Sequence, residues 1–159
     1  MKQRGFEIIS SYKDQEVSLP QRATKGAAGY DFEAAEQVIV PSIWKLQEQG
    51  AAPKPVLVKT GIKAYMAEDE YLELVSRSSN PLKRFLMLAN GVGVIDRDYY
   101  NNEGNEGHIM FQFINFGYED MVIKKGERIG QGIFKPFLLA DVDTVEKERT
   151  GGFGSSGKN

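Results

Sequence analysis

The segment that decides the fold is residues 56–75, which read VLVKTGIKAYMAEDEYLELV. It holds two apolar runs, residues 56–66 and 71–75, on either side of a short polar stretch. Runs rich in Val, Ile, Phe and Tyr and bounded by Gly, Asn, Asp or Pro are typical of strands joined by tight turns. Similar runs recur along the chain, at residues 6–9, 37–40, 85–89, 108–116, 121–124 and 129–134. The pattern predicts an all-β domain: a sandwich, a jelly roll or a barrel.

Two segments depart from this strand pattern. Asn80 and Pro81 predict the only helical turn, because Asn can cap a helix and Pro suits its first position. Residues 42–55 are polar and contain Trp44, the only Trp, so we expect a surface excursion there.

Composition limits the classes of function. The 159 residues suit one domain, and 20 Lys plus Arg against 22 Asp plus Glu leave a net charge of −2, so we expect no binding of long nucleic acid. The absence of Cys excludes disulfides, thiolate nucleophiles and Cys-ligated zinc. His108, the single His, cannot form a multi-histidine site, and we expect it to be an ordinary strand residue. No apolar stretch suits a signal peptide or a membrane span, so a cytoplasmic protein without membrane association is expected.

The stretch GGFGSSGKN at residues 151–159 fits two phosphate-binding patterns, but no helix follows it to supply the usual amides and dipole. Successive glycines nevertheless let backbone N–H groups converge on an anion. Phe153 could lie on a base, Ser155 and Ser156 offer hydroxyls, and Arg149 is a nearby cation. We therefore expect a mobile nucleotide-binding tail, and a frayed terminus is the alternative.

Residues 90–99 (NGVGVIDRDY) are the strongest candidate for catalysis. The two glycines let the backbone bend and approach a ligand closely. Asp96 follows the apolar pair Val94 and Ile95, so its carboxylate should lie at a strand end, where it can orient or deprotonate a water. Tyr99 offers a flat ring to a sugar or base. The alternative is a hairpin with a turn-stabilising Asp.

Three shorter segments carry weaker signals. The sequence RSS at residues 77–79 could form an oxyanion site at a helix start, or it could be a solvated surface cap. Asp31 is the single carboxylate of residues 28–32 (AGYDF) and could anchor a metal-bound water or form a turn. Residues 128–131 (RIGQ) place a guanidinium and the amide of Gln131 close together. Each segment, taken singly, is more often structural.

Taken in order, the segments AGYDF, SRSSN, GVGVIDRDYY, RIGQ and RTGGFGSSG resemble the five motifs of the trimeric dUTPases, and they span residues 28–157. The resemblance implies a jelly-roll or distorted β-barrel subunit, a homotrimer with shared active sites, and Mg²⁺-dependent conversion of dUTP to dUMP and pyrophosphate. It also implies that residues 1–148 form the β domain and that residues 149–159 are a flexible lid on a shared site.

The resemblance assigns roles to individual residues. Asp96 corresponds to the residue that activates the water attacking the α-phosphorus, and Tyr99 to the ring that packs under deoxyribose and excludes a 2′-hydroxyl. In the family, a glycine-bearing hairpin forms hydrogen bonds with uracil and sterically excludes a 5-methyl group. The corresponding residues here are Asn90, Gly93, Val94, Ile95 and the Asp96 backbone. The implied phosphate ligands are Arg77, Ser78, Ser79 and Gln131.

The lid residues implied by the same resemblance are Arg149, Phe153, Gly154, Ser155 and Ser156. The metal is held mainly by triphosphate oxygens and water, in keeping with the preference of Mg²⁺ for such ligands, and Asp31 supports it only through water. No direct protein ligand to the metal is expected.

Three features depart from the commoner family pattern. The spacing between Arg149 and Phe153 is one residue shorter than in many members, Asn80 replaces a small apolar residue, and residues 100–107 and 42–55 resemble the longer loops of some bacterial and phage enzymes.

The sequence leaves two rival functions. The dCTP deaminases and the bifunctional deaminase–diphosphatases share the fold and an RSS motif. They carry a proton-shuttling Glu where this chain has Gln112, and an amide cannot take up a proton at neutral pH. The second rival is a protein-binding role, similar to the docking of some phage dUTPases on repressor proteins, with Trp44 and residues 42–55 contacting the partner.

Overall fold

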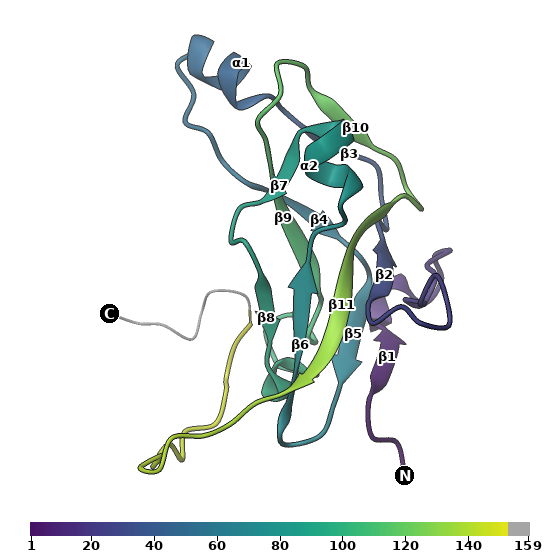
Figure 1. Cartoon of the computed structure of the whole chain (residues 1–159), viewed down its shortest axis with the longest axis vertical. Coiled ribbons are helices and arrows are strands. Elements are labelled where there is room, and N and C mark those ends of the chain that lie inside the picture. Colours follow the sequence, from purple (N-terminus) through teal and green to yellow (C-terminus); the bar gives the residue numbers. More distant parts are fainter. Residues whose placement is uncertain (153–159) are drawn as a thin grey trace.

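Eleven short strands make up most of the regular structure in the computed structural model, which describes residues 1–152 (Figure 1). The strands are β1 (Gly5–Ile8), β2 (Tyr30–Glu33), β3 (Val38–Val40), β4 (Val56–Lys59), β5 (Ile62–Tyr65), β6 (Glu70–Val75), β7 (Leu86–Leu88), β8 (Gly93–Ile95), β9 (Met110–Asn115), β10 (Met121–Ile123) and β11 (Arg128–Pro136). The helices are α1 (Ile43–Glu48) and α2 (Ser79–Arg84), and the 3₁₀ turns are η1 (Ser10–Tyr12) and η2 (Arg97–Tyr99). None of the described helices is long and apolar enough to cross a bilayer.

The strands form antiparallel sheets that wrap around one core. The largest has the order β2-β11-β6-β8, and a second has the order β4-β9-β7. The two-stranded sheets β1-β5 and β10-β3 lie at opposite ends of the molecule (Figure 1). This arrangement confirms the predicted all-β, jelly-roll class.

The apolar run of residues 56–66 turns a corner between two sheets. Its first half is β4, which pairs with β9, and its second half is β5, which pairs with β1. The corner is Thr60 and Gly61; Gly61 has a φ of +71°, and the buried Thr60 hydroxyl donates to the Ile109 carbonyl at 2.6 Å. A glycine suits this position because few other residues adopt positive φ without strain.

Aromatic rings in the core pack against glycines of β11, where there is no space for a side chain. The rings of Phe32 and Phe111 lie 5.5 Å apart and are completely or almost completely buried. A Cβ atom on Gly130 would lie 2.2 Å from the Phe111 ring, and one on Gly132 would lie 2.9 Å from the Phe32 ring. The glycines of β11 are therefore packing requirements, which close β11 tightly onto the core.

Residues 42–55 contain a helix that the sequence did not predict. The six-residue α1 is too short to be stable alone, and contacts with residues 116–119 support it. The Trp44 indole Nε1 donates to the Phe116 carbonyl at 3.0 Å, and its ring stacks on Tyr118 at 6.1 Å. The expectation of a single helical turn near Asn80 was thus incomplete, because tertiary contacts stabilise a second one.

Asn80 does not cap α2, contrary to the sequence-based expectation. The helix begins one residue earlier, at Ser79, with Ser78 in the N-cap position. The Asn80 side chain is buried and its Nδ2 donates to the Ile129 carbonyl at 2.8 Å and to the Ser76 hydroxyl at 3.2 Å. Ile129 lies where the β11-β2 register shifts, so Asn80 supplies a hydrogen bond that the ladder does not provide there.

Candidate active site

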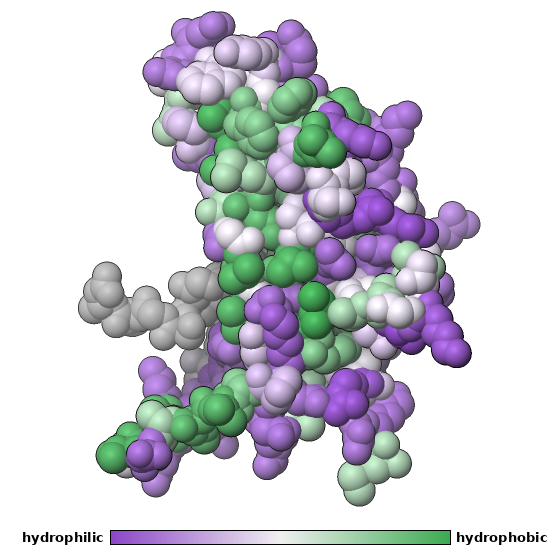
Figure 2. Space-filling view, in the orientation of Figure 1, coloured by the Kyte–Doolittle hydropathy of each residue, from purple (hydrophilic) through white to green (hydrophobic). Residues whose placement is uncertain are grey.

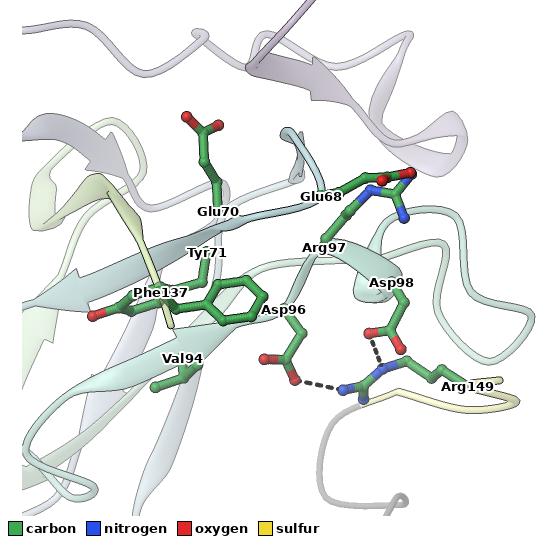
Figure 3. Close-up of a pocket in the computed structure, with 9 residues that line it drawn as sticks. All are labelled: Glu68, Glu70, Tyr71, Val94, Asp96, Arg97, Asp98, Phe137 and Arg149. Atoms are coloured by element: carbon green, nitrogen blue, oxygen red, sulfur yellow. Dashed lines mark hydrogen bonds and ion pairs between the residues drawn. The ribbon is translucent and has the colours of Figure 1, made fainter. Parts of the chain in front are cut away.

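Asp96 directly follows β8 and precedes η2, at the strand end that its position after Val94 and Ile95 predicts. Its carboxylate is paired with Arg149, whose Nη2 donates to Asp96 Oδ2 at 2.6 Å and whose Nε donates to Asp98 Oδ1 at 2.8 Å (Figure 3). The Asp96 side chain is 52% exposed, whereas that of Arg149 is 14% exposed. The carboxylate thus stays accessible to a ligand, while the guanidinium is held against the protein.

Two adjoining pockets meet at this ion pair. One has a volume of about 540 Å³ and is also lined by Tyr71, Arg97 and Phe137 (Figure 3). The other, of about 280 Å³, is lined by the residues expected to read a base and sugar: Asn90, Gly93, Ile95, Tyr99 and also Gln112. Val94, Asp96 and Arg149 line both pockets. A ligand that spanned the two pockets would pass directly over the Asp96 carboxylate.

The glycine-bearing segment before Asp96 is not a hairpin, which corrects the sequence-based expectation. β7 pairs with β9 and β8 pairs with β6, so the intervening residues cross from one sheet to the other. The turn is made by Gly91, with a φ of +71°. Gly93 packs closely on Leu74, since a Cβ atom there would lie 3.0 Å from the Leu74 Cβ. β8 is the edge strand of its sheet, and its residues Gly93, Val94 and Ile95 line the smaller pocket.

The Tyr99 ring is buried and held at its hydroxyl. The hydroxyl donates to the His108 carbonyl at 2.7 Å and accepts from Asn105 Nδ2 at 2.7 Å. Burial raises the pKa of Tyr99, so the hydroxyl stays protonated and can donate. The Arg149 guanidinium carbon lies 5.9 Å from the ring centroid, within the range of a cation–π contact.

A second polar cluster gathers Asp31, Arg77, Arg128 and Gln131. The Asp31 carboxylate lies 3.6 Å from Arg77 Nε and 3.6 Å from Arg128 Nη1, and Gln131 Nε2 donates to the Ser76 carbonyl at 3.3 Å. Ser78 and Ser79 lie beside it at the start of α2. Gly29 makes room, because a Cβ atom on it would lie 2.1 Å from Gln131 Oε1.

The two clusters lie at opposite ends of β6. In the register, Leu72 faces Ile95, so Asp96 lies beside the start of β6, whereas Arg77 follows its end. A strand rises about 3.3 Å per residue, which separates these positions by roughly 20 Å. No hydrogen bond or ion pair among the described side chains joins the clusters. One chain therefore does not bring its own Arg77 to its own Asp96.

The described residues contain no group of three or more acidic or His side chains that could hold a metal ion. The expected metal-supporting residue, Asp31, lies between two guanidinium groups. Two cations beside one carboxylate do not make a protein cage for Mg²⁺, so an ion here would need phosphate oxygens and water as its ligands.

The expected lid residues Phe153, Gly154, Ser155 and Ser156 lie outside the described part of the chain. Among described residues, sequence reasoning missed Asp98 and Asn105. Asp98 carried a signal, because it is two positions from Asp96 and beside the predicted site. Asn105 carried none beyond its place in a polar, turn-forming stretch.

The family model for dUTPase matches residues 15–157. A deoxyuridine 5′-triphosphate nucleotidohydrolase of Lactococcus lactis is 51% identical over 160 residues, which cover 99% of each chain. The chain belongs to the dUTPase family.

One solved dUTPase structure supports this assignment, and a more distant one supports the fold. A dUTPase from Streptococcus mutans is 48% identical, with a TM-score of 0.77 over 87% of this chain and 99% of that one. A dUTPase from phage phi11 of S. aureus is 19% identical, with a TM-score of 0.69 over 97% of this chain and 99% of that one, and supports the fold alone.

Membership of the dUTPase family establishes the reaction: hydrolysis of dUTP to dUMP and pyrophosphate. The deaminase alternative is not favoured. Gln112 lines the smaller pocket and has no acid–base chemistry at neutral pH.

Proposed function

We propose that dUTP lies across the two adjoining pockets and that Asp96 is the general base of its hydrolysis. The water oxygen attacks the α-phosphorus, its proton passes to the Asp96 carboxylate, and the bond from the α-phosphorus to the bridging oxygen breaks to release pyrophosphate. The observation that carries this proposal is the position of the Asp96 carboxylate, accessible and shared by both pockets.

The smaller pocket would take uracil and deoxyribose. Asn90 and the backbone of residues 93–95 offer donors and acceptors to the base, and a 5-methyl group would meet that backbone. The Tyr99 ring would pack under the sugar and leave no space for a 2′-hydroxyl. Exclusion of this kind can discriminate strongly between substrates.

We further propose a homotrimer in which Arg77, Ser78, Ser79 and Gln131 of one protomer bind the phosphates over Asp96 of another. The separation of roughly 20 Å along β6 supports this, because both groups must meet one triphosphate. The segment after β11 also exposes apolar side chains that a neighbouring protomer would cover (Figure 2). The exposed residues are Leu138, Leu139, Val142 and Val145.

The arm of residues 149–159 would close on the bound nucleotide. Arg149 is already at the site and would exchange its carboxylate partners for a phosphate, while Phe153 would cover uracil and residues 154–156 would contact the γ-phosphate. Closure would exclude water other than the nucleophile.

Mg²⁺ would neutralise charge on the triphosphate oxygens. Asp31 would hold its water ligands from outside the coordination sphere. The two arginines beside Asp31 would bind phosphate, not metal.

Pyrophosphate release from dUTP, dTTP, UTP and dCTP tests the proposed specificity. We expect strong preference for dUTP, and equal turnover of dTTP would refute the base-reading role. Hydrolysis in ¹⁸O-water should label dUMP; label in pyrophosphate would exclude attack at the α-phosphorus.

Mixing of inactive variants tests the shared sites. Asp96→Asn chains and Arg77→Ala chains, each inactive alone, should regain activity when unfolded and refolded together, because some sites then combine two intact halves. Absence of recovery in trimers that contain both chains, verified by mass, would refute sharing.

A second candidate role is binding of a protein partner through residues 42–55. Trp44 and Tyr118 are both exposed and stacked on each other, as expected for an interface anchor. Pull-down with and without residues 42–55 distinguishes it from a purely structural loop.

A further inference from the structure

Residues 100–107 (YNNEGNEG), one of the two long loops, form a closed hydrogen-bond network beside Tyr99. Asn102 Nδ2 donates to the Tyr99 carbonyl at 2.7 Å and to Asn105 Oδ1 at 2.8 Å. Asn102 Oδ1 accepts from the backbone N–H groups of Gly104 and Asn105, at 2.9 and 3.1 Å. The loop is therefore ordered by its own side chains.

The orientation of the Asn105 amide follows from its partners. Its Oδ1 accepts from the Gly107 backbone at 3.1 Å and from Asn102, so its NH₂ group must face the Tyr99 hydroxyl. That hydroxyl already donates to the His108 carbonyl. The two hydrogen bonds fix the far end of the Tyr99 ring from both sides.

The same asparagines lie against the C-terminal arm. A Cβ atom on Gly152 would lie 2.6 Å from Asn105 Oδ1 and 3.0 Å from Asn102 Oδ1. A Cβ atom on Gly104 would lie 3.4 Å from the Gly152 nitrogen. The arm backbone thus packs directly on the loop, three residues after Arg149.

A partly buried ion pair anchors the loop to the β domain. The Glu106 carboxylate accepts from Lys63 Nζ at 2.7 Å and from the Ser10 backbone N–H at 3.1 Å. Lys63 Nζ also donates to Asn101 Oδ1 at 2.6 Å. The hydrogen bond from Lys63, followed by those from the Ser10 hydroxyl and backbone N–H, lowers the pKa of Glu106 to about 2. The contacts hold the loop to β5 and η1.

We propose that Asn105 is a positioning residue that orients the Tyr99 ring for rejection of ribonucleotides and seats the arm at Gly152. It touches neither substrate nor reacting atoms; it acts through Tyr99 and the arm backbone. This inference rests on the proposed contact between Tyr99 and deoxyribose.

The isosteric substitution Asn105→Asp separates orientation of Tyr99 from folding of the loop. The carboxylate keeps an acceptor for Asn102 and Gly107 but cannot donate to the Tyr99 hydroxyl, so the single hydroxyl proton can serve either the His108 carbonyl or the carboxylate and one of the two orienting hydrogen bonds is lost. We expect the ratio of kcat/KM for dUTP to that for UTP to fall about tenfold, as for loss of one orienting hydrogen bond, with Tm near that of the wild type. Glu103→Gln, at an exposed position of the same loop, should leave the ratio unchanged.

A double-mutant cycle tests the route through Tyr99. Tyr99→Phe removes the hydroxyl, so it should lower the ratio by itself and make a further Asn105→Asp change almost silent. An unchanged ratio in Asn105→Asp, or full additivity with Tyr99→Phe, would overturn the positioning role. If the wild type itself did not prefer dUTP to UTP, the proposed role of Tyr99 would fail first, and this inference with it.

Discussion

The Nη2 atom of Arg149 lies 2.6 Å from Oδ2 of Asp96, so the proposed general base is paired with a cation from the arm that is proposed to close over the substrate. The same guanidinium reaches Asp98 at 2.8 Å and the Tyr99 ring at 5.9 Å. One side chain therefore connects the arm with the groups expected to touch water and sugar. A triphosphate offers it a stronger partner than either carboxylate.

We accordingly predict that Arg149 leaves Asp96 when nucleotide binds. The ¹⁵Nε resonance of Arg149, assigned by loss in Arg149→Lys, should shift on addition of a non-hydrolysable dUTP analogue with Mg²⁺. The same resonance should not shift with the dTTP analogue at equal concentration. An unchanged ¹⁵Nε chemical shift at saturating dUTP analogue would show that Arg149 stays paired with Asp96 when nucleotide binds.

Asp96→Asn should lower kcat by roughly 10² to 10⁴, because the amide keeps the shape of the side chain but cannot accept the proton of the water. Affinity for the analogue should change little. Asp98→Asn is the matched control: it also loses a contact with Arg149, yet it should retain most of kcat. Near-normal turnover in Asp96→Asn would remove Asp96 from the mechanism.

Phe153→Ala should lower kcat/KM, and deletion of residues 151–159 should lower it further, because the deletion removes every proposed lid residue except Arg149. Tm should stay close to the wild-type value in both, since the strands and the core lie upstream. Calorimetry gives Tm and pyrophosphate release gives kcat/KM on the same preparations. Full activity of the deletion variant would contradict the proposed lid role.

Asn80→Ala should destabilise the fold by about 1–3 kcal/mol, since it leaves the Ile129 carbonyl without its buried partner. Asn80→Asp is a useful comparison, because it cannot donate to that carbonyl and should be at least as destabilised. Urea denaturation gives the difference in unfolding free energy. A stability equal to that of the wild type would mean that another donor or water satisfies Ile129.

Stability should fall as the pH drops from 6.5 towards 4, because His108 must take up a proton on unfolding. Its Nε2 accepts from the Gly61 backbone N–H at 2.9 Å, and burial, with a smaller contribution from Lys59, lowers its pKa from 6.5 to about 4. A folded-state pKa below the unfolded value gives stability that is complete above pH 6.5 and is lost below it, by up to about 3 kcal/mol.

His108→Gln keeps an acceptor for Gly61 without titrating, so its unfolding free energy should be nearly flat between pH 6.5 and 5. Equal slopes for the two proteins in this window would assign the pH dependence to other groups, such as carboxylates that titrate lower.

Local chemistry in the sequence was enough to predict the class of fold and the position of Asp96 at a strand end. Runs of β-branched and aromatic residues bounded by glycines form strands whichever sheet they join. A carboxylate that directly follows Val94 and Ile95 lies at the end of such a strand. The ordered motifs predicted the family for the same reason, because each motif is a short segment that can be recognised from its own residues without knowledge of the tertiary structure.

Long-range contacts decided the other features of the fold and the site. They join residues that are distant along the chain, and the sequence around each residue does not indicate its partner. Trp44 stabilises α1 only because Phe116 lies beneath it, and Asn80 faces inward only because the β11 ladder leaves Ile129 unpaired. The register of β6 put Arg77 and Asp96 at opposite ends of one strand, which no spacing along the sequence indicates. The support of Tyr99 by Asn105 likewise depends on how the loop folds back, since side-chain hydrogen bonds form only after the backbone has brought their partners together.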